Sequence, residues 1–356
     1  MDFRIDPDQR ASFKRCRRQW DFAAPHRRGL EPLDDSRPAL AAALIDALAV
    51  YYYPGTWDWQ PDLKQSLVHK AVERSLTDAG ADGLSAAATA LLDCYDAWAK
   101  VVDDFAPVKI GHDVAGMLID PADPERGLLA PNGSGVLYTC RVDLLAVDAA
   151  DEYWVVRHQI VDGWQDRDEL MRDEAAVAAC WAWEQDYIGM QIVGTIHNEL
   201  RTDLPLDRPG PATPRLRGSV AQHEGSGGGR SIPQHQRESV RASRAEPANR
   251  FEQHTAGPVR RTRIRRSRDE LSSAGAQLAA EALDMLRDPA IYPSPGAHCS
   301  VCEFAAPCLA MFAGSDPEPV LAAQFRRRSL TEAKPRLGQA TWGFGRGAAP
   351  PKWNQP

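Results

Sequence analysis

Apolar residues recur at helical spacing through the first third of the chain. In the range 84–105, Leu91, Tyr95, Trp98 and Val102 fall on one face of a helix. Helices are likewise predicted at 11–20, 38–53 and 63–77. The first of these is short and basic, and it carries Cys16.

Beyond Phe105 the pattern changes from helical spacing to β-rich runs that are broken by Pro, Asp and Gly. Strands are predicted at 108–119, 135–147 and 153–161, then a helix at 169–187 and one more strand at 190–197. Helices followed by three strands, a helix and a strand predict a mixed α/β core.

The range 202–258 breaks this order. Pro, Gly, Ser, Arg and Gln predominate in it, and apolar periodicity is nearly absent. Such a segment buries too little apolar surface to offset the entropy lost on ordering, so we expect a disordered basic linker. Order is expected to resume with a helix that opens on a capping box of Ser267 and Glu270.

The chain is therefore expected to have six parts. These are an N-terminal segment (1–37), a helical region (38–105), an α/β core (106–201), the linker (202–258), a helix and cysteine segment (259–330) and a flexible tail (331–356).

The formal net charge of −7 is unevenly distributed. From Arg230 to Arg268 there are eleven arginines against three glutamates, and the first 28 residues add eight Lys and Arg. Such segments can contact nucleic-acid phosphates. A solvated basic linker that binds nothing specific is the alternative.

No secretory signal is visible, because the opening MDFRIDPDQR has no apolar stretch. The most apolar range, 38–53, is too short to span a bilayer and contains Asp46. We therefore expect a cytoplasmic protein that does not enter a membrane, in a compartment where thiols stay reduced and clustered cysteines indicate metal rather than disulfides.

Four cysteines form a candidate metal site. The motif CSVCEFAAPC supplies Cys299, Cys302 and Cys308, and FKRCRRQW supplies Cys16. Four thiolates suit the tetrahedral irons of a 4Fe–4S cluster, and a ligand from the far end of the chain would couple cluster assembly to folding. Zinc uses the same ligands, although its sites usually combine two close pairs, and incidental cysteines are a further alternative.

Cys94, Cys140 and Cys180 each lie inside a predicted helix or strand among apolar residues. We expect them to belong to the hydrophobic core.

A lone cysteine near the N-terminus followed by Cys-x2-Cys-x5-Cys near the C-terminus resembles the iron–sulfur branch of the RecB-like PD-(D/E)XK nucleases. That branch includes the AddB nuclease domain and the CRISPR-associated iron–sulfur exonucleases. ASFKRCRRQWDF is similar to its opening helix, YTCRVDLLAVD to its aspartate-bearing strand, and YWVVRHQIV to the catalytic strand that follows. The resemblance implies a restriction-endonuclease-like mixed sheet flanked by helices, closed by an iron–sulfur clasp.

In that family a histidine on an early helix, a strand aspartate and a second carboxylate bind Mg or Mn, and a lysine helps to activate water. The resemblance places the strand aspartate at Asp143. The second carboxylate would fall at Arg157 and the lysine at Gln159, and neither can take that role. On the early helix the nearest metal ligand is Asp46, and Glu174 is a loose stand-in for a glutamine–tyrosine motif.

The expected function is therefore a catalytically weakened nuclease fold that binds DNA, or a helicase, repair or defence partner. The alternatives are an active Mn- or Mg-dependent DNA nuclease that uses Asp143, and a redox-sensing regulator that uses the cluster. No phosphate-binding glycine motif is present in the chain, since GSGGGRS lacks the lysine and the flanking strand and helix.

Overall fold

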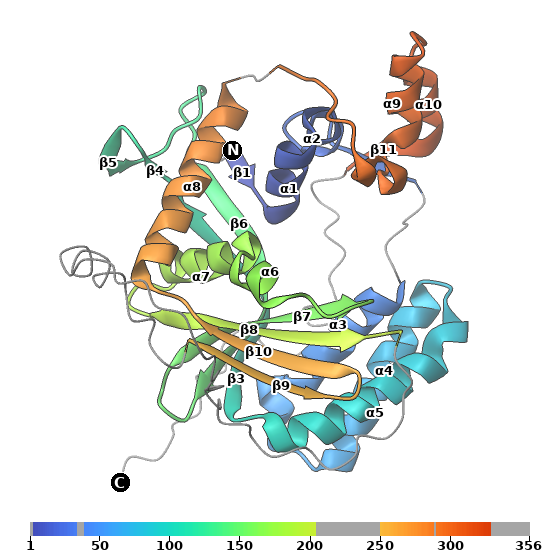
Figure 1. The fold of residues 1–356 in the computed structure, drawn as a ribbon, viewed down its shortest axis with the longest axis vertical. Helices are drawn as coiled ribbons and strands as arrows, with labels where there is room; N and C mark the ends of the chain where they lie inside the picture. Colours follow the sequence, from blue (N-terminus) through green and yellow to red (C-terminus); the bar gives the residue numbers. More distant parts are fainter. Residues whose placement is uncertain (1–2, 34–38, 204–249, 288–289, 329–356) are drawn as a thin grey trace, which may run out of the picture.

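The computed structural model describes residues 3–33, 39–203, 250–287 and 290–328. A seven-stranded sheet of parallel and antiparallel strands runs through these residues, and helices cover both of its faces (Figure 1). The chain is thus an α/β protein with a mixed sheet flanked by helices, as the order of predicted elements indicated.

The elements have the following bounds. The strands are β1 Phe3–Ile5, β2 Leu30–Pro32, β3 Phe105–Met117, β4 Ile119–Asp120, β5 Asp123–Gly127, β6 Val136–Asp148, β7 Tyr153–Val161, β8 Ile192–Arg201, β9 Phe251–Ala256, β10 Val259–Arg265 and β11 Phe325–Arg327. The helices are α1 Pro7–Arg15, α2 Arg17–Ala23, α3 Ala39–Tyr51, α4 Pro61–Asp78, α5 Ser85–Val102, α6 Arg167–Met171, α7 Glu174–Asp186, α8 Arg268–Leu286, α9 Ala305–Phe312 and α10 Glu318–Gln324. Short 3₁₀ helices include η1 Pro54–Thr56, η2 Asp82–Leu84 and η4 Ala297–Val301.

Strand β6 organises the sheet. β3 pairs with one edge of β6 over nearly its whole length, and two shorter pairings share the other edge. Along that second edge β1 lies parallel to residues 136–138, and β7 lies antiparallel to residues 144–147. β8 then lies parallel to β7, β10 antiparallel to β8, and β9 completes the sheet. Because β7 and β8 are parallel, the chain must cross back over the sheet between them, and α6 and α7 lie in that crossover.

Each face of the sheet has its own hydrophobic core, because side chains alternate along a strand. On β7, Val155 joins the core beneath α7 and α8, whereas Trp154 and Val156 join the core beneath α3, α4 and α5. Cys140 and Cys180 are buried in the first core and Cys94 is buried in α5. The prediction that these three are core residues is confirmed.

Several predicted bounds agree with the structure. Strand β7 spans the predicted 153–161, and the capping box of Ser267 and Glu270 opens α8. Two predicted helices are each divided into two. The range 11–20 breaks at Cys16, which has extended backbone angles, and 169–187 breaks before α7, where the Asp173 side chain caps the Ala176 N–H.

The linker prediction was wrong at its C-terminal end. Residues 251–256 of the predicted linker form β9, which pairs with β10 as a hairpin. The polar sequence of β9 does not predict a strand. β9 forms because it pairs with the buried strand β10, and not because its own residues are apolar. The rest of the predicted linker, 204–249, and the predicted tail, 331–356, lie outside the described residues.

The most apolar predicted segment is α3, which packs beneath the sheet. In the parts of the chain that the structure describes, no helix is long and apolar enough to cross a membrane.

Candidate functional site

The two ends of the described chain lie against each other. β2 pairs antiparallel with β11, so that Leu30 faces Arg327 and Pro32 faces Phe325. Phe22 of α2 and Phe304 join Leu321 and Phe325 in a small buried cluster that is separate from the two cores of the sheet. Figure 1 shows this pairing beside α2 and below α9 and α10. We refer to residues 16–32 and 290–328 together as the end region.

The four candidate cysteines line one cavity in the end region. Cys16 comes from the break between α1 and α2, Cys299 from η4, Cys302 from the turn after it, and Cys308 from α9. All four line a cavity of about 120 Å³. Cys16 is buried and Cys299 is exposed, so the cavity reaches from the interior of the end region to its surface.

The cavity is mainly apolar, and this affects its thiols. Phe22, Phe304, Leu309 and Phe312 contribute to its lining. Burial raises the pKa of the Cys302 thiol, and the nearby Cys16, Cys299 and Cys308 raise it further. A bound metal cation would reverse this preference, because it stabilises thiolates.

The donor set is that of a metal group. The cavity presents four sulfur ligands, which is the ligand set of an iron–sulfur cluster and also of some zinc sites. Among the described residues, no group of three or more His, Cys, Asp and Glu is placed so that it could hold a metal ion. The four cysteines therefore share a cavity lining but are not gathered at the spacing of a metal site.

One cation reaches into this cavity. Arg18 Nη1 donates to Cys308 Sγ at 3.4 Å, and the guanidinium lies 5.4 Å from the centre of the Phe312 ring. The Arg18 backbone N–H also donates to the Tyr292 carbonyl, at 3.2 Å. Arg18 therefore connects α2 to both sides of the cysteine segment.

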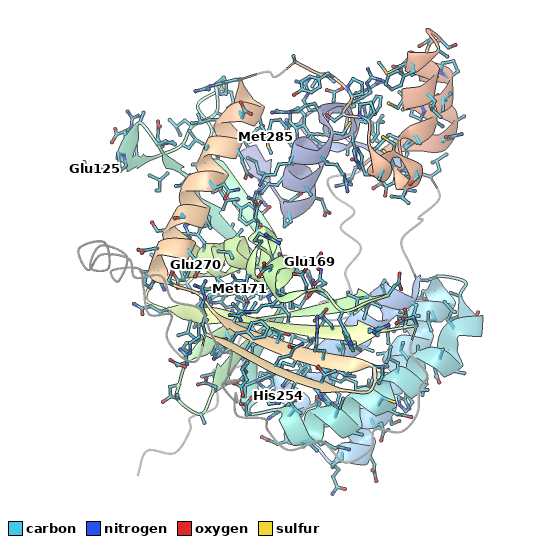
Figure 2. All side chains as sticks on the ribbon, in the orientation of Figure 1. Glu125, Glu169, Met171, His254, Glu270 and Met285 are labelled. Carbon is cyan, nitrogen blue, oxygen red and sulfur yellow. The ribbon has the colours of Figure 1, made fainter. Side chains whose placement is uncertain are left out.

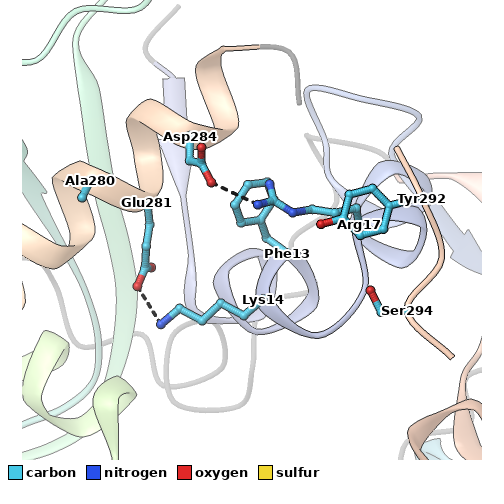
Figure 3. A pocket seen from close by; sticks show the side chains of 8 residues that line it. All are labelled: Phe13, Lys14, Arg17, Ala280, Glu281, Asp284, Tyr292 and Ser294. Atoms are coloured by element: carbon cyan, nitrogen blue, oxygen red, sulfur yellow. Dashed lines mark hydrogen bonds and ion pairs between the residues drawn. The ribbon is translucent and has the colours of Figure 1, made fainter. Parts of the chain in front are cut away.

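A second, more open cleft adjoins the cavity, and Ser294 lines both. It has a volume of about 380 Å³ and lies between α1, α2 and α8 (Figure 3). Its cations are already paired, Lys14 with Glu281 at 2.6 Å and Arg17 with Asp284 at 3.0 Å. These ion pairs tie the helices on either side of Cys16 to the helix that leads to the cysteine trio.

The residues that the resemblance matches to a nuclease site lie where β6 and β7 separate. Their pairing runs from Val147 opposite Tyr153 to Leu144 opposite Val156 and ends there. Asp143 follows at the gap, and its Oδ2 accepts the His158 backbone N–H at 3.0 Å. The carboxylate therefore satisfies a strand amide at the point where the ladder stops, as a strand-end aspartate would.

The position expected for the second carboxylate holds a paired cation. Arg157 Nη1 donates to Asp173 Oδ2 at 2.5 Å, and Asp173 also caps α7. Gln159 Oε1 lies 3.4 Å from His197 Nδ1, and burial lowers the pKa of His197 to about 3. The residues at these two expected positions, Arg157 and Gln159, therefore contact Asp173 and a neutral imidazole.

Asp46 and Glu174 are held by other neighbours. Asp46 Oδ2 accepts from Ser75 Oγ of α4 at 3.1 Å. Glu174 lies at the start of α7, where Lys14 and Arg10 of α1 bind it. Asp46 thus contacts α4 and Glu174 contacts α1, whereas Asp143 is held by the His158 backbone N–H.

The described arginines of the basic segment that ends at Arg268 have partners within the protein. The arginines from 250 to 268 pair with the protein's own carboxylates or carbonyls, in the following sets: Arg250 with Glu270, Arg260 with Glu199, Arg261 with Asp103, Arg263 with Asp104, Arg265 with Glu152, Arg266 with Leu170 and Met171, and Arg268 with Glu184. Figure 2 labels Met171 and Glu270, and Arg266 contacts the Met171 carbonyl and the Glu270 carboxylate. Within β10, Arg261, Arg263 and Arg265 are two residues apart and lie on one face of the sheet, whereas Arg260 lies on the other face.

Sequence reasoning missed a buried polar network on the α3–α5 face. Arg261 pairs with Asp103 at 2.7 Å and donates through Nε to Asn198 at 2.8 Å. The Tyr52 hydroxyl lies 2.7 Å from that of Tyr95 and also contacts Asp103. No local pattern marks these residues, because they come from α5, β8, β10 and the residues that follow α3 and α5, and they meet only in the folded chain.

His158 stacks on Tyr52 beside this network, with ring centroids 5.6 Å apart. Burial lowers the pKa of His158 to about 4, so the ring is neutral near pH 7.

Comparisons with known proteins add little to this geometry. No family model matches the chain, and no curated protein matches it. A solved structure described as "Crystal structure of SSO0001" is similar with a TM-score of 0.30 and 9% identity, and the match covers 73% of this chain and 82% of that chain. A likeness at this level carries no argument about function.

Proposed function

We propose that this chain is a RecB-like PD-(D/E)XK nuclease-fold protein whose two ends are joined by a 4Fe–4S cluster and whose cleavage site has been replaced by internal ion pairs. It acts by binding DNA or a repair or defence partner rather than by cutting. The observation that carries this proposal is the cavity where Cys16 meets Cys299, Cys302 and Cys308.

The order of the sheet supports the nuclease-like fold. The antiparallel run of β3, β6 and β7 is followed by α7 and by β8, which is parallel to β7. Asp143 lies at the gap between β6 and β7, where the resemblance places the family's strand aspartate. The strand order and the position of Asp143 both support the proposed fold.

The surroundings of Asp143 support the loss of catalysis. A divalent cation needs several oxygen ligands, and the positive charge of Arg157 opposes a metal beside Asp143. Arg157 forms an ion pair with Asp173, which also caps α7. A metal that displaced Arg157 would break this ion pair and leave the Asp173 carboxylate without its cation. Phosphodiester cleavage would lack the charge stabilisation that metal and lysine supply.

The proposed cluster has a structural role, in which it joins the two ends of the chain through the cysteines. When bound, the cluster supplies iron–thiolate bonds that cross-link residues far apart in the chain. Cys16, at the extended backbone between α1 and α2, lines the cavity from one side, and η4, the turn after it and α9 present Cys299, Cys302 and Cys308. The apolar lining excludes water from the side of the cavity nearest Cys16.

Iron and acid-labile sulfide in the anaerobically purified protein test the cluster. We expect equal amounts of the two and a broad visible absorbance, all lost in Cys16→Ser. Cys94→Ala is the matched control, because Cys94 is equally buried but lies in α5. Zinc without iron, or a cluster that survives Cys16→Ser, contradicts the assignment.

The cleavage part is tested on end-labelled single- and double-stranded DNA with Mn²⁺. We expect no cleavage by the cluster-loaded protein. The double variant Arg157→Glu/Gln159→Lys restores the family's residue types and is expected to gain activity that Asp143→Ala abolishes. Cleavage by the unmodified chain that is lost in Asp143→Ala means that the protein is an active nuclease.

DNA binding is tested by titration at increasing salt. Exposed cations such as Arg15 and Arg327 remain accessible on the end region and beside it. Affinity that falls steeply with salt is expected, because each phosphate contact releases counterions. If no binding occurs at low salt, DNA is not the ligand and the proposal is limited to a protein partner.

A further inference from the structure

We propose that Arg18 is a positioning residue for the cluster: its guanidinium holds the Cys308 sulfur and compensates the negative charge of the bound group. The inference rests on the proposed function and concerns a side chain that the cysteine motif does not include. It predicts that Arg18 influences both the lifetime and the redox equilibrium of the cluster.

The geometry of Arg18 supports this role. Nη1 donates to Cys308 Sγ at 3.4 Å, and the guanidinium lies against the face of Phe312. The Nε atom is buried and has no hydrogen-bond partner among the described residues, so one donor in the cavity lining is available to an anionic group. A planar guanidinium can hold a sulfur and stack on a ring at once, which an ammonium cannot do.

The electrostatics of the cavity explain why a cation is useful there. Four thiolates give the cluster a net negative charge, and the aromatic and aliphatic lining offers it little solvation. Among the residues that line this cavity in the described chain, Arg18 is the one that carries a permanent positive charge. Reduction adds a further negative charge, so a fixed cation beside Cys308 stabilises the reduced state more than the oxidised one.

A purely structural role for Arg18 is the alternative. Its side chain also joins α2 to α9, and a loss of that contact could weaken the end region without any effect on the cluster's electronics. The redox equilibrium separates the two roles, because a structural contact alone does not change it.

The test compares Arg18→Gln with Arg15→Gln in the full-length, cluster-loaded protein. Arg15 directly precedes Cys16 in sequence, but it is exposed and donates to Gln19 rather than to a cysteine. Dithionite titration followed by visible absorbance gives the redox equilibrium. The loss of that absorbance in air-saturated buffer gives the lifetime.

For Arg18→Gln we expect the equilibrium to shift about tenfold towards the oxidised cluster, ~59 mV for one electron. We also expect the cluster to be lost several-fold faster in air. Arg15→Gln is expected to match the unmodified protein in both. If the two variants have equal potentials and equal cluster lifetimes, the role proposed for Arg18 is wrong. If the unmodified protein contains no iron, the proposed cluster itself is wrong.

Phe312→Leu provides a second test that keeps the charge. Phe312 is 60% exposed, so its replacement should leave the fold intact while it removes the ring against which Arg18 lies. We expect a shorter cluster lifetime with a smaller shift in potential. If Arg18→Gln fails to fold, an unchanged lifetime in Phe312→Leu overturns the inference.

Discussion

The sheet and the end region are stabilised in different ways. The sheet has a large hydrophobic core on each face, and its buried charges are paired within the protein. The end region has a small core built around Phe22, Phe304, Leu321 and Phe325, a three-residue strand pairing and an apolar cavity lined by thiols. Small cores rarely hold a fold alone, and metal binding is a common additional source of stability.

This difference shows where each region's stability originates. If the proposed cluster binds, the sheet should keep its structure when the cluster is removed, whereas the end region should depend on it. The three predictions below test this contrast, in order of their expected effect on the free energy of unfolding of the sheet.

The largest effect is expected from Arg261→Met. Arg261 is 1% exposed and pairs with Asp103, so its truncation leaves a buried carboxylate without its cation. Burial already raises the pKa of Asp103, which shows how poorly this site solvates charge on its own. We expect a loss of about 3–5 kcal/mol in the free energy of unfolding, measured by urea denaturation.

The double variant Arg261→Met/Asp103→Leu is the control for that prediction. It removes both charges and should recover most of the lost stability. If the double variant is as unstable as the single one, packing of the Arg261 side chain against Trp98 and Phe105 is the larger contribution.

The next effect is a loss of stability at acidic pH through His158. Its folded-state pKa is lowered by burial to about 4, from about 6.5 in the unfolded chain. The unfolded state therefore binds the proton more readily, so this stability is fully present above about pH 6.5 and is lost as the pH falls towards 4. We expect the free energy of unfolding to fall by about 3 kcal/mol across that pH range, measured by denaturation at several pH values.

His158→Phe keeps a ring against Tyr52 but removes the titrating group. The variant should show a flatter pH dependence than the unmodified protein, with the remaining slope due to other buried histidines such as His197. An unchanged slope would show that His158 does not contribute.

The smallest effect on the sheet is expected from Cys302→Ser, which removes one proposed cluster ligand. We expect the free energy of unfolding of the sheet to fall by less than about 1 kcal/mol, because Cys302 packs with the core of the end region. Hydrogen exchange should increase in residues 290–328 and stay slow in β6, β7 and β8. A uniform increase across the sheet contradicts the proposed independence of the two regions.

The sequence by itself determined the features that depend on local pattern. The β-rich run Tyr153–Val161 defined β7, and Ser267 with Glu270 defined the start of α8. The spacing of Cys299, Cys302 and Cys308 indicated a shared site, and Cys16 does line the same cavity. These features are local because periodicity and capping depend on residues that are near each other in the chain.

Only the tertiary structure decided which charges are available to a ligand. The arginines of β10 were expected to be a basic arm, yet they pair with Asp103, Glu152 and Glu199, which lie far from them in sequence. Likewise, Arg157 could be recognised as a replaced ligand, but its partner Asp173 could not. Ion pairs and strand β9 depend on neighbours brought together by folding, and a sequence pattern does not encode those neighbours.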